Sequence, residues 1–306
     1  MDKNSKIFIT GHSGLVGSTL LKRLTAEGYT NIVTRTHSEL DLINQQQTEE
    51  FFKQEKPEYV FHTAARMGGL QTQIERPADF IYGNTMIAAN VIHSSYKYGV
   101  KKLLYIGSSW AYPNNVPQPI KEESLMSAKL EKTNEAYGIA KITGVKLCEY
   151  YHRQYGVDFI SCMPGNLYGI GDKFDPAHSH VIPALVKKFC EADKNGEVVI
   201  WGDGSPRREF LYIDDMADVC LFLMLNYDSP EPINVGTGEE VSIRQLAEKI
   251  AKISGFEGKM TYDTTKPNGS PRKLLDCSKL LSMGWKPKVS LETGLRMVYD
   301  NFNKNM

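Results

Sequence analysis

The sequence predicts an α/β fold in which a doubly wound parallel sheet is combined with a smaller α/β C-terminal domain. In the first half of the chain, short apolar segments alternate with longer segments of helical spacing. These short segments are apolar throughout, which is typical of parallel strands covered by helices on both faces. The second half is interrupted by Gly and Pro, which indicates a smaller and less regular unit.

The elements of the first half follow in a regular order. We expect strands at 6–10, 31–35, 59–63, 102–107 and 158–163, and helices at 15–27, 48–55, 78–98 and 135–155. In the second half, helical spacing predicts helices at 181–193, 216–225, 243–254 and 291–301. We therefore expect one domain of residues 1–165, to which the chain returns around 212–240, and a second made mainly of residues 166–306.

Composition excludes several classes of protein. The chain has 306 residues, and its 36 Lys and Arg balance 36 Asp and Glu, so it is a poor candidate for binding nucleic acid. We find no signal peptide and no apolar run of about 18 residues that could cross a membrane. The five cysteines form no C-x-x-C pair, which favours free thiols and a cytoplasmic location. We expect no metal site, because His178 and His180 lack the H-E-x-x-H spacing.

A glycine-rich segment follows the first expected strand and opens the first expected helix. It has the pattern G-x-x-G-x-x-G, and its candidate cofactor-binding residues are Gly11, Ser13, Gly14, Leu15, Val16 and Gly17. Glycines at this junction allow a tight turn and let a pyrophosphate approach the helix N-terminus. The sequence therefore predicts a dinucleotide site at this junction.

The end of the second strand indicates which dinucleotide binds. An NAD site usually has an acidic residue there, which holds the ribose 2′-hydroxyl. This chain instead has Arg35 and His37, with no acidic residue before Glu39. Because a cation suits a 2′-phosphate, we expect NADPH as the cofactor.

Tyr137 and Lys141 form a Y-x-x-x-K motif inside a long expected helix. This spacing puts both side chains on one face of the helix, where the ammonium should lower the pKa of the phenol. Ser108 and Ser109 follow the fourth strand, at the carboxyl edge where such sheets bind ligands. Together with the phosphate loop, these residues predict an oxidoreductase in which Ser108 holds a carbonyl beside Tyr137.

With these motifs, the chain resembles the extended short-chain dehydrogenase/reductases, and within them the GDP-L-fucose synthase family. The resemblance runs over essentially the whole chain. Its most specific stretches are GHSGLVGS (11–18), PADFIYGN (77–84), GSSWAYP (107–113), TNEAYGIAK (133–141), NLYG (166–169), SHVIPAL (179–185), WGDGSPRREFLYIDDMA (201–217), INVGTG (233–238) and PRKLLD (271–276).

The resemblance implies a Rossmann domain that binds NADPH and a C-terminal domain that binds a GDP-linked 4-keto sugar. It implies that Tyr137 donates the proton to O4, Lys141 adjusts the pKa of Tyr137, Ser108 holds the carbonyl and His180 acts as an acid or base. Further cofactor contacts are expected from Pro164, Asn166, Leu167 and His180. Further substrate contacts are expected from Ser109, Trp110, Asn166, Lys188, Trp201, Arg208 and Asp276.

Physical chemistry agrees with the implied substrate contacts. Lys188 and Arg208 can pair with a diphosphate, and the Asp276 carboxylate can accept hydrogen bonds from a ribose or sugar hydroxyl. The resemblance also implies a homodimer formed through helices near 84–99 and 135–154. It further implies a role in supplying nucleotide sugar for a capsule or surface polysaccharide.

Two departures from the family pattern leave alternatives open. The family assigns epimerisation at C3 and C5 to a cysteine and a histidine; here Trp110 replaces the cysteine, and an indole cannot act as a base at neutral pH. The favoured hypothesis is a C4-ketoreductase of a 6-deoxyhexose or heptose. The alternative is a bifunctional GDP-L-fucose synthase in which His180 and a water replace the cysteine. The family also places arginines at positions 13 and 37, where this chain has Ser13 and His37, which weakens the NADPH expectation.

A third hypothesis, of another class, is a non-catalytic NADP-binding protein. Such a protein is expected to lose Tyr137 or Lys141, and this chain has both.

Overall fold

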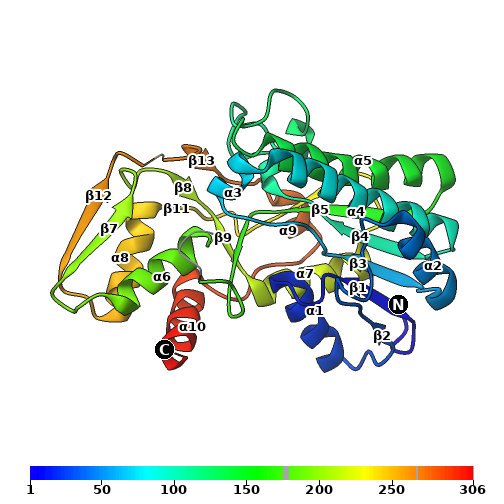
Figure 1. Ribbon diagram of the computed structural model, residues 1–306, viewed down its shortest axis with the longest axis horizontal. Helices are drawn as coiled ribbons and strands as arrows, with labels where there is room; N and C mark the ends of the chain where they lie inside the picture. The colour runs from blue at the N-terminus through cyan, green and yellow to red at the C-terminus, as the bar shows by residue number, and fades with distance from the viewer. Residues whose placement is uncertain (175–178, 267, 306) are drawn as a thin grey trace.

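The central element of the computed structural model is a parallel sheet of six strands in the order β10-β5-β4-β3-β1-β2 (Figure 1). The structure describes residues 1–174, 179–266 and 268–305. The strands of this sheet are β1 (Ile7–Thr10), β2 (Ile32–Val33), β3 (Tyr59–His62), β4 (Lys102–Ile106), β5 (Asp158–Pro164) and β10 (Ile233–Val235). The strand order reverses between β1 and β3, and in such sheets the carboxyl ends of the strands on either side of the reversal form the ligand crevice.

Helices cover both faces of the sheet, as its apolar strands require. On one face lie α1 (Leu15–Ala26) and α7 (Ile213–Asn226), which pack against each other. On the other face lie α2 (Gln45–Glu55), α4 (Pro77–Lys97) and α5 (Glu135–Tyr155) (Figure 1). The doubly wound α/β fold predicted from the sequence is confirmed.

Helix boundaries follow local chemistry. The side chain of Asn44 caps α2 by accepting from the backbone N–H of Gln47, and α5 ends at Gly156, whose φ is +66°. α7 begins three residues before its expected start, at Ile213. Asp214 and Asp215 then fall in its first turn, where negative charge is favourable to the helix dipole.

The C-terminal region lies at the left of Figure 1, around three helices and several short strands. The helices are α6 (Val181–Glu191), α8 (Ile243–Ser254) and α10 (Leu291–Lys304). One pair of strands is β7 (Glu197–Trp201) with β12 (Lys259–Asp263), and another is β6 (Asn166–Tyr168) with β9 (Phe210–Tyr212). A three-stranded sheet has the order β11 (Val241–Ser242), β8 (Arg207–Arg208) and β13 (Arg272–Lys273).

Several short elements were not expected from the sequence. Besides the strands of the C-terminal region, they are α3 (Leu70–Glu75), α9 (Ser278–Ser282) and the 3-10 helices η1 (Ser109–Ala111) and η2 (Glu122–Ser124). Segments of two to six residues are too short to show a hydrophobic period, so sequence patterns do not reveal them.

The second half of the chain returns to the central sheet. β10 pairs in parallel with β5, with Val235 opposite Pro164, and α7 packs on α1. One apolar core joins the α1 and α7 face of the sheet to the C-terminal region, since Ile7 and Leu20 belong to the same buried cluster as Val186 and Leu246. In the described part of the chain, no helix has the length and apolar character needed to cross a membrane.

Candidate active site

The phosphate loop connects β1 to α1 and is tightly packed. Gly11 has a φ of +65°, and a Cβ at this position would lie 2.8 Å from the Cα of Ala64. A Cβ on Gly17 would lie 2.3 Å from the carbonyl oxygen of Gly11. Gly14 is the N-cap of α1 and provides no side chain to cap the first N–H groups, so these can face an anion. This cradle fits the pyrophosphate of a dinucleotide.

The end of β2 differs from the sequence expectation. The guanidinium of Arg35 lies 2.6 Å from the Glu55 carboxylate and also donates to the carbonyl of Thr34. Arg35 is therefore held by the last residue of α2, and a 2′-phosphate would compete with Glu55 for it. The neighbouring His37 is exposed, with its Nδ1 3.7 Å from Asp41.

Tyr137 and Lys141 lie on the buried face of α5. Lys141 donates to the carbonyl of Ile106 over 2.7 Å, and its ammonium lies 5.8 Å from the centre of the Tyr137 ring. Burial lowers the pKa of Lys141 to about 8. Burial also raises the pKa of Tyr137, although a hydrogen bond with Ser108 opposes this.

The direction of the Tyr137 shift is opposite to the expectation from the Y-x-x-x-K spacing. The cost of burying a phenolate outweighs the attraction of an ammonium that is already bonded to a backbone carbonyl. Tyr137 therefore stays protonated at neutral pH, which is the state needed to donate a proton.

Ser108, Ser109 and Trp110 follow β4 after one residue, Gly107. The Ser108 hydroxyl caps η1 by accepting from the backbone N–H of Trp110 over 3.2 Å, and Ser109 is buried. The Trp110 ring lies 4.6 Å from the ammonium of Lys273, measured to the ring centre. Trp110 thus places an aromatic ring beside Lys273, two residues after Ser108, at the position where the resemblance expects a thiol.

Cys148, further along α5, does not replace that thiol. It is fully buried in the core on the α4 and α5 face of the sheet, and burial raises the pKa of its thiol. An inaccessible, protonated thiol is neither a base nor a nucleophile.

His180 is exposed at the N-terminus of α6, as the residue that precedes Val181. Asp172 lies close enough to interact with it electrostatically: burial raises the pKa of Asp172, whereas the charge of His180 lowers it. Oδ2 of Asp172 is buried and has no hydrogen-bond partner among residues 1–174, 179–266 and 268–305. Sequence analysis did not anticipate this carboxyl group beside His180.

The remaining residues predicted to contact the cofactor lie where β5 ends. Pro164 is the last residue of β5, and Leu167 pairs with Leu211. The Asn166 amide donates to the carbonyl of Glu209 over 3.0 Å. These contacts link the end of the central sheet to the segment that carries Arg208.

Trp201 lies at the far end of the predicted substrate region and is 60% exposed. Two ammonium groups lie near its ring, those of Lys188 at 5.6 Å and Lys266 at 5.5 Å from the ring centre. Lys188 also donates to the carbonyl of Val199. The contacts of Lys188 are therefore with the strand that carries Trp201, whereas the sequence predicted that Lys188 and Arg208 both bind a diphosphate.

Arg208 and Asp276 lie on segments joined by a buried carboxylate. Arg208 is 7% exposed and donates to the carbonyl of Arg207, and burial lowers its pKa to about 10. Hydrogen bonds from the Ser278 hydroxyl and N–H hold the pKa of Asp276 below its ordinary value. An ionised Asp276 is suited to accept a hydrogen bond from a hydroxyl.

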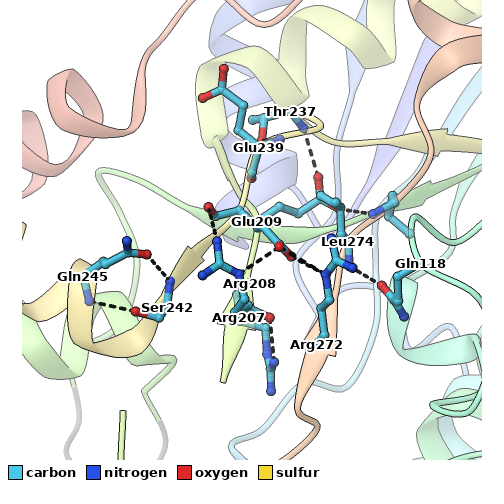
Figure 2. A network of polar contacts seen from close by, with 12 residues as sticks. Gln118, Arg207, Arg208, Glu209, Thr237, Glu239, Ser242, Gln245, Arg272 and Leu274 are labelled. Atoms are coloured by element: carbon cyan, nitrogen blue, oxygen red, sulfur yellow. Dashed lines mark hydrogen bonds and ion pairs between the residues drawn. The ribbon is translucent and has the colours of Figure 1, made fainter. Parts of the chain in front are cut away.

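Glu209 is the carboxylate that joins these segments. It is 1% exposed and accepts from the backbone N–H of Thr237 at 3.1 Å (Figure 2). It also accepts from the backbone N–H of Leu275 at 2.8 Å and of Gly238 at 3.4 Å. Burial raises its pKa to about 7 against the opposing effect of these bonds. Glu209 and Lys273 were not predicted from the sequence. The available signal was a charged residue directly before apolar residues, in the stretches 201–217 and 271–276.

The described residues contain no group of three or more His, Cys, Asp or Glu side chains that could hold a metal ion.

Comparison with known proteins identifies the relatives of this chain. The model of the NAD dependent epimerase/dehydratase family matches residues 7–236. GDP-L-fucose synthase 1 of Arabidopsis thaliana is 55% identical over 307 residues, which cover 100% of this chain and 95% of the relative. GDP-L-fucose synthase of Escherichia coli is 46% identical, over 98% of this chain and 97% of the relative.

Two solved structures from Campylobacter jejuni are also similar. A GDP-6-OMe-4-keto-L-xylo-heptose reductase superposes with a TM-score of 0.95 at 39% identity, covering 100% of this chain and 99% of that one. A GDP-mannoheptose C4 reductase with NADP bound has a TM-score of 0.90 at 41% identity, covering 99% of each chain.

Proposed function

This chain belongs to the GDP-L-fucose synthase family within the NAD dependent epimerase/dehydratase family, and from that premise we propose that it reduces C4 of a GDP-4-keto sugar without epimerising C3 or C5. As a member of this family it is an NADP-dependent oxidoreductase of the short-chain dehydrogenase/reductase type. The observation that supports loss of epimerisation is the position of Trp110. Its indole lies against Lys273 and follows directly after Ser108 and Ser109.

The residues around Tyr137 can carry out the reduction. The bound nicotinamide supplies the hydride for C4. The hydroxyls of Ser108 and Tyr137 are within hydrogen-bonding distance of each other, so both can turn to donate to one carbonyl oxygen as it develops negative charge. Tyr137 then transfers its proton to O4, which general acid catalysis accelerates by a factor of about 10²–10⁴. Lys141, fixed on the Ile106 carbonyl, stabilises the phenolate that remains.

Epimerisation requires different groups. A 4-keto group acidifies the hydrogens at C3 and C5, and inversion needs one group to remove a proton and another to return it on the opposite face. His180 can serve one face. Trp110, at the position of the second group, has no basic atom, and Cys148 is buried away from the site. A substrate epimerised by another enzyme therefore fits this site best.

A reaction in D₂O tests the proposal. GDP-4-keto-6-deoxymannose and NADPH are supplied, and C3, C4 and C5 of the product are examined by NMR. We expect hydride at C4 and no deuterium at C3 or C5. Deuterium with inverted configuration at either carbon would contradict the loss of epimerisation. If this sugar is not turned over, the same assay is repeated with GDP-4-keto-heptoses. Absence of reduction with every GDP-4-keto sugar would overturn the proposed reaction.

A bifunctional GDP-L-fucose synthase is the second candidate, favoured by the 55% identity to the Arabidopsis enzyme. The Trp110→Cys variant separates the two candidates. If Trp110 is the cause of the loss, the cysteine variant gains exchange of solvent deuterium into the sugar while its rate of C4 reduction stays measurable. If the wild-type protein already exchanges, a group other than residue 110 acts as the base.

We further propose a cytoplasmic homodimer that supplies nucleotide sugar for a surface polysaccharide. α4 and α5 pack side by side and expose Tyr82, Ile139, Tyr150 and Tyr155, each at least 40% accessible. All five cysteines are free thiols, which suits a reducing compartment. Light scattering at micromolar concentration tests the dimer, and glutamates at positions 82 and 150 should give a monomer.

A further inference from the structure

The adenosine half of the dinucleotide site lies between the phosphate loop and the turn that follows β2. In sheets of this type, the ribose of the adenosine is held near the end of the second strand. A 2′-phosphate brings about two negative charges and needs cations, whereas a 2′-hydroxyl needs one hydrogen-bond acceptor. The charges of residues 34–41 therefore decide which of the two cofactors fits.

Arg35, two residues after β2, is directed away from the phosphate loop. Its guanidinium lies 2.6 Å from Glu55 and 5.4 Å from the centre of the Phe51 ring, both on α2. Glu55 also lies 3.3 Å from the ammonium of Lys6. Because Glu55 ends the helix before β3 and Lys6 precedes β1, these ion pairs lie toward the amino edge of the sheet. The phosphate loop follows β1 at the opposite, carboxyl edge.

Ser13 and His37 occupy the positions where the resemblance expects arginines, and neither offers a free positive charge. Ser13 is uncharged. The Nδ1 atom of His37 lies 3.7 Å from the carboxylate of Asp41 in the same turn. A 2′-phosphate would therefore have to compete with Glu55 for Arg35 and with Asp41 for His37.

Glu39 places a carboxylate in this turn, close to the phosphate loop. Its Oε2 accepts from the backbone N–H and the hydroxyl of Thr36, each over 2.7 Å, while Oε1 accepts no hydrogen bond from the residues that the structure describes. These bonds lower the pKa of Glu39, and the charges of Arg35 and of His12 in the phosphate loop lower it further. Glu39 also follows Gly17 by 22 residues, close to the spacing of about 20 at which an acidic residue holds a ribose 2′-hydroxyl.

We propose that Glu39 accepts a hydrogen bond from the ribose 2′-hydroxyl of NAD(H), and that this protein binds NAD(H) about as tightly as NADP(H). The 2′-hydroxyl gains a charged acceptor in Glu39. The 2′-phosphate can attract Arg35, but it competes with Glu55 for that guanidinium and meets the negative charge of Glu39.

Calorimetric titration with the two oxidised cofactors tests the proposal. No sugar is present, so the outcome does not depend on the proposed reaction. In the wild type, the dissociation constants of NAD⁺ and NADP⁺ should lie within about threefold of each other. Glu39→Gln keeps the size of the side chain and removes its charge. It should weaken NAD⁺ binding by about three- to tenfold, because a charged acceptor is lost, and leave NADP⁺ binding unchanged or tighter.

Glu55→Gln is the complementary variant, and Glu49→Gln is its matched control. Both glutamates lie on α2 and pair with a cation over 2.6 Å, but Glu49 pairs with Lys97 on α4. Releasing Arg35 should tighten NADP⁺ binding by about three- to tenfold and leave NAD⁺ binding unchanged. This gain should shrink in about 0.5 M NaCl, because salt screens exposed charges. Glu49→Gln should change the binding of neither cofactor.

Each result has a defined meaning. NADP⁺ bound more than about threefold tighter than NAD⁺ by the wild type would overturn the proposal without any variant. Equal losses of both cofactors in Glu39→Gln would mean that Glu39 only supports the turn through Thr36, and would overturn its role. Equal NADP⁺ affinities of Glu55→Gln and Glu49→Gln would contradict a competition for Arg35. Similar binding of both cofactors without reduction of any GDP-4-keto sugar would support this proposal and refute the proposed reaction.

Discussion

Replacing the buried Glu209 by glutamine should change how the stability of the protein depends on pH. Burial raises the pKa of Glu209 to about 7, from an ordinary value of 4.5. When the pH rises, the unfolded chain therefore loses this proton before the folded protein does. Since the folded state then binds more protons than the unfolded state, the free energy of unfolding falls between about pH 4.5 and pH 7, by about 3 kcal/mol.

Urea unfolding at about pH 4.5 and about pH 8 measures this contribution. Glutamine cannot ionise, so the stability of wild type minus that of Glu209→Gln should fall by about 2–4 kcal/mol between the two conditions. Glu240→Gln is the matched control. Burial opposes ionisation of Glu240, but the hydrogen bonds from Arg272 and Arg207 dominate and lower its pKa. The same difference for Glu240→Gln should therefore rise with pH.

A pH-independent difference for Glu209→Gln would refute the reasoning. It would mean that the hydrogen bonds from the backbone N–H groups of Leu275, Thr237 and Gly238 offset burial and leave the pKa of Glu209 at its ordinary value. A difference that rises with pH would mean that these bonds outweigh burial and lower the pKa.

Further predictions concern the cofactor and the reaction. Tyr137→Phe should lower kcat by about 10²–10⁴ while NADP⁺ affinity and the circular dichroism spectrum are retained. A variant with near-normal kcat would exclude Tyr137 as the proton donor. Gly17→Ala should weaken NADP⁺ binding or folding by about 1–3 kcal/mol, because its Cβ would lie 2.3 Å from the Gly11 carbonyl oxygen. Calorimetry and thermal unfolding measure this. Normal affinity and stability in Gly17→Ala would contradict a tightly packed loop.

Much of the fold could be predicted from the sequence because its signals are local. The apolar strands and the long helices of the central sheet have hydrophobic periods within one segment, and their observed bounds lie within a few residues of those expected. The phosphate loop and the spacing of Tyr137 and Lys141 are likewise properties of one short stretch. Short strands such as β8 and β13 have no such period, and they form only because distant segments meet.

Tertiary structure decided which charged groups of the site are paired and in which direction their pKa values are shifted. Arg35 is paired because Glu55, twenty residues later, ends its helix beside it. Burial, which depends on the whole fold, raises the pKa of Tyr137 against the effect expected from its neighbour Lys141. Lys273 meets Trp110 across 163 positions of sequence. The sequence by itself determined which chemical groups this protein has. Contacts between segments far apart in the chain decided which of these groups are paired, buried or left without a counterion, because burial and charge interactions depend on distance in space.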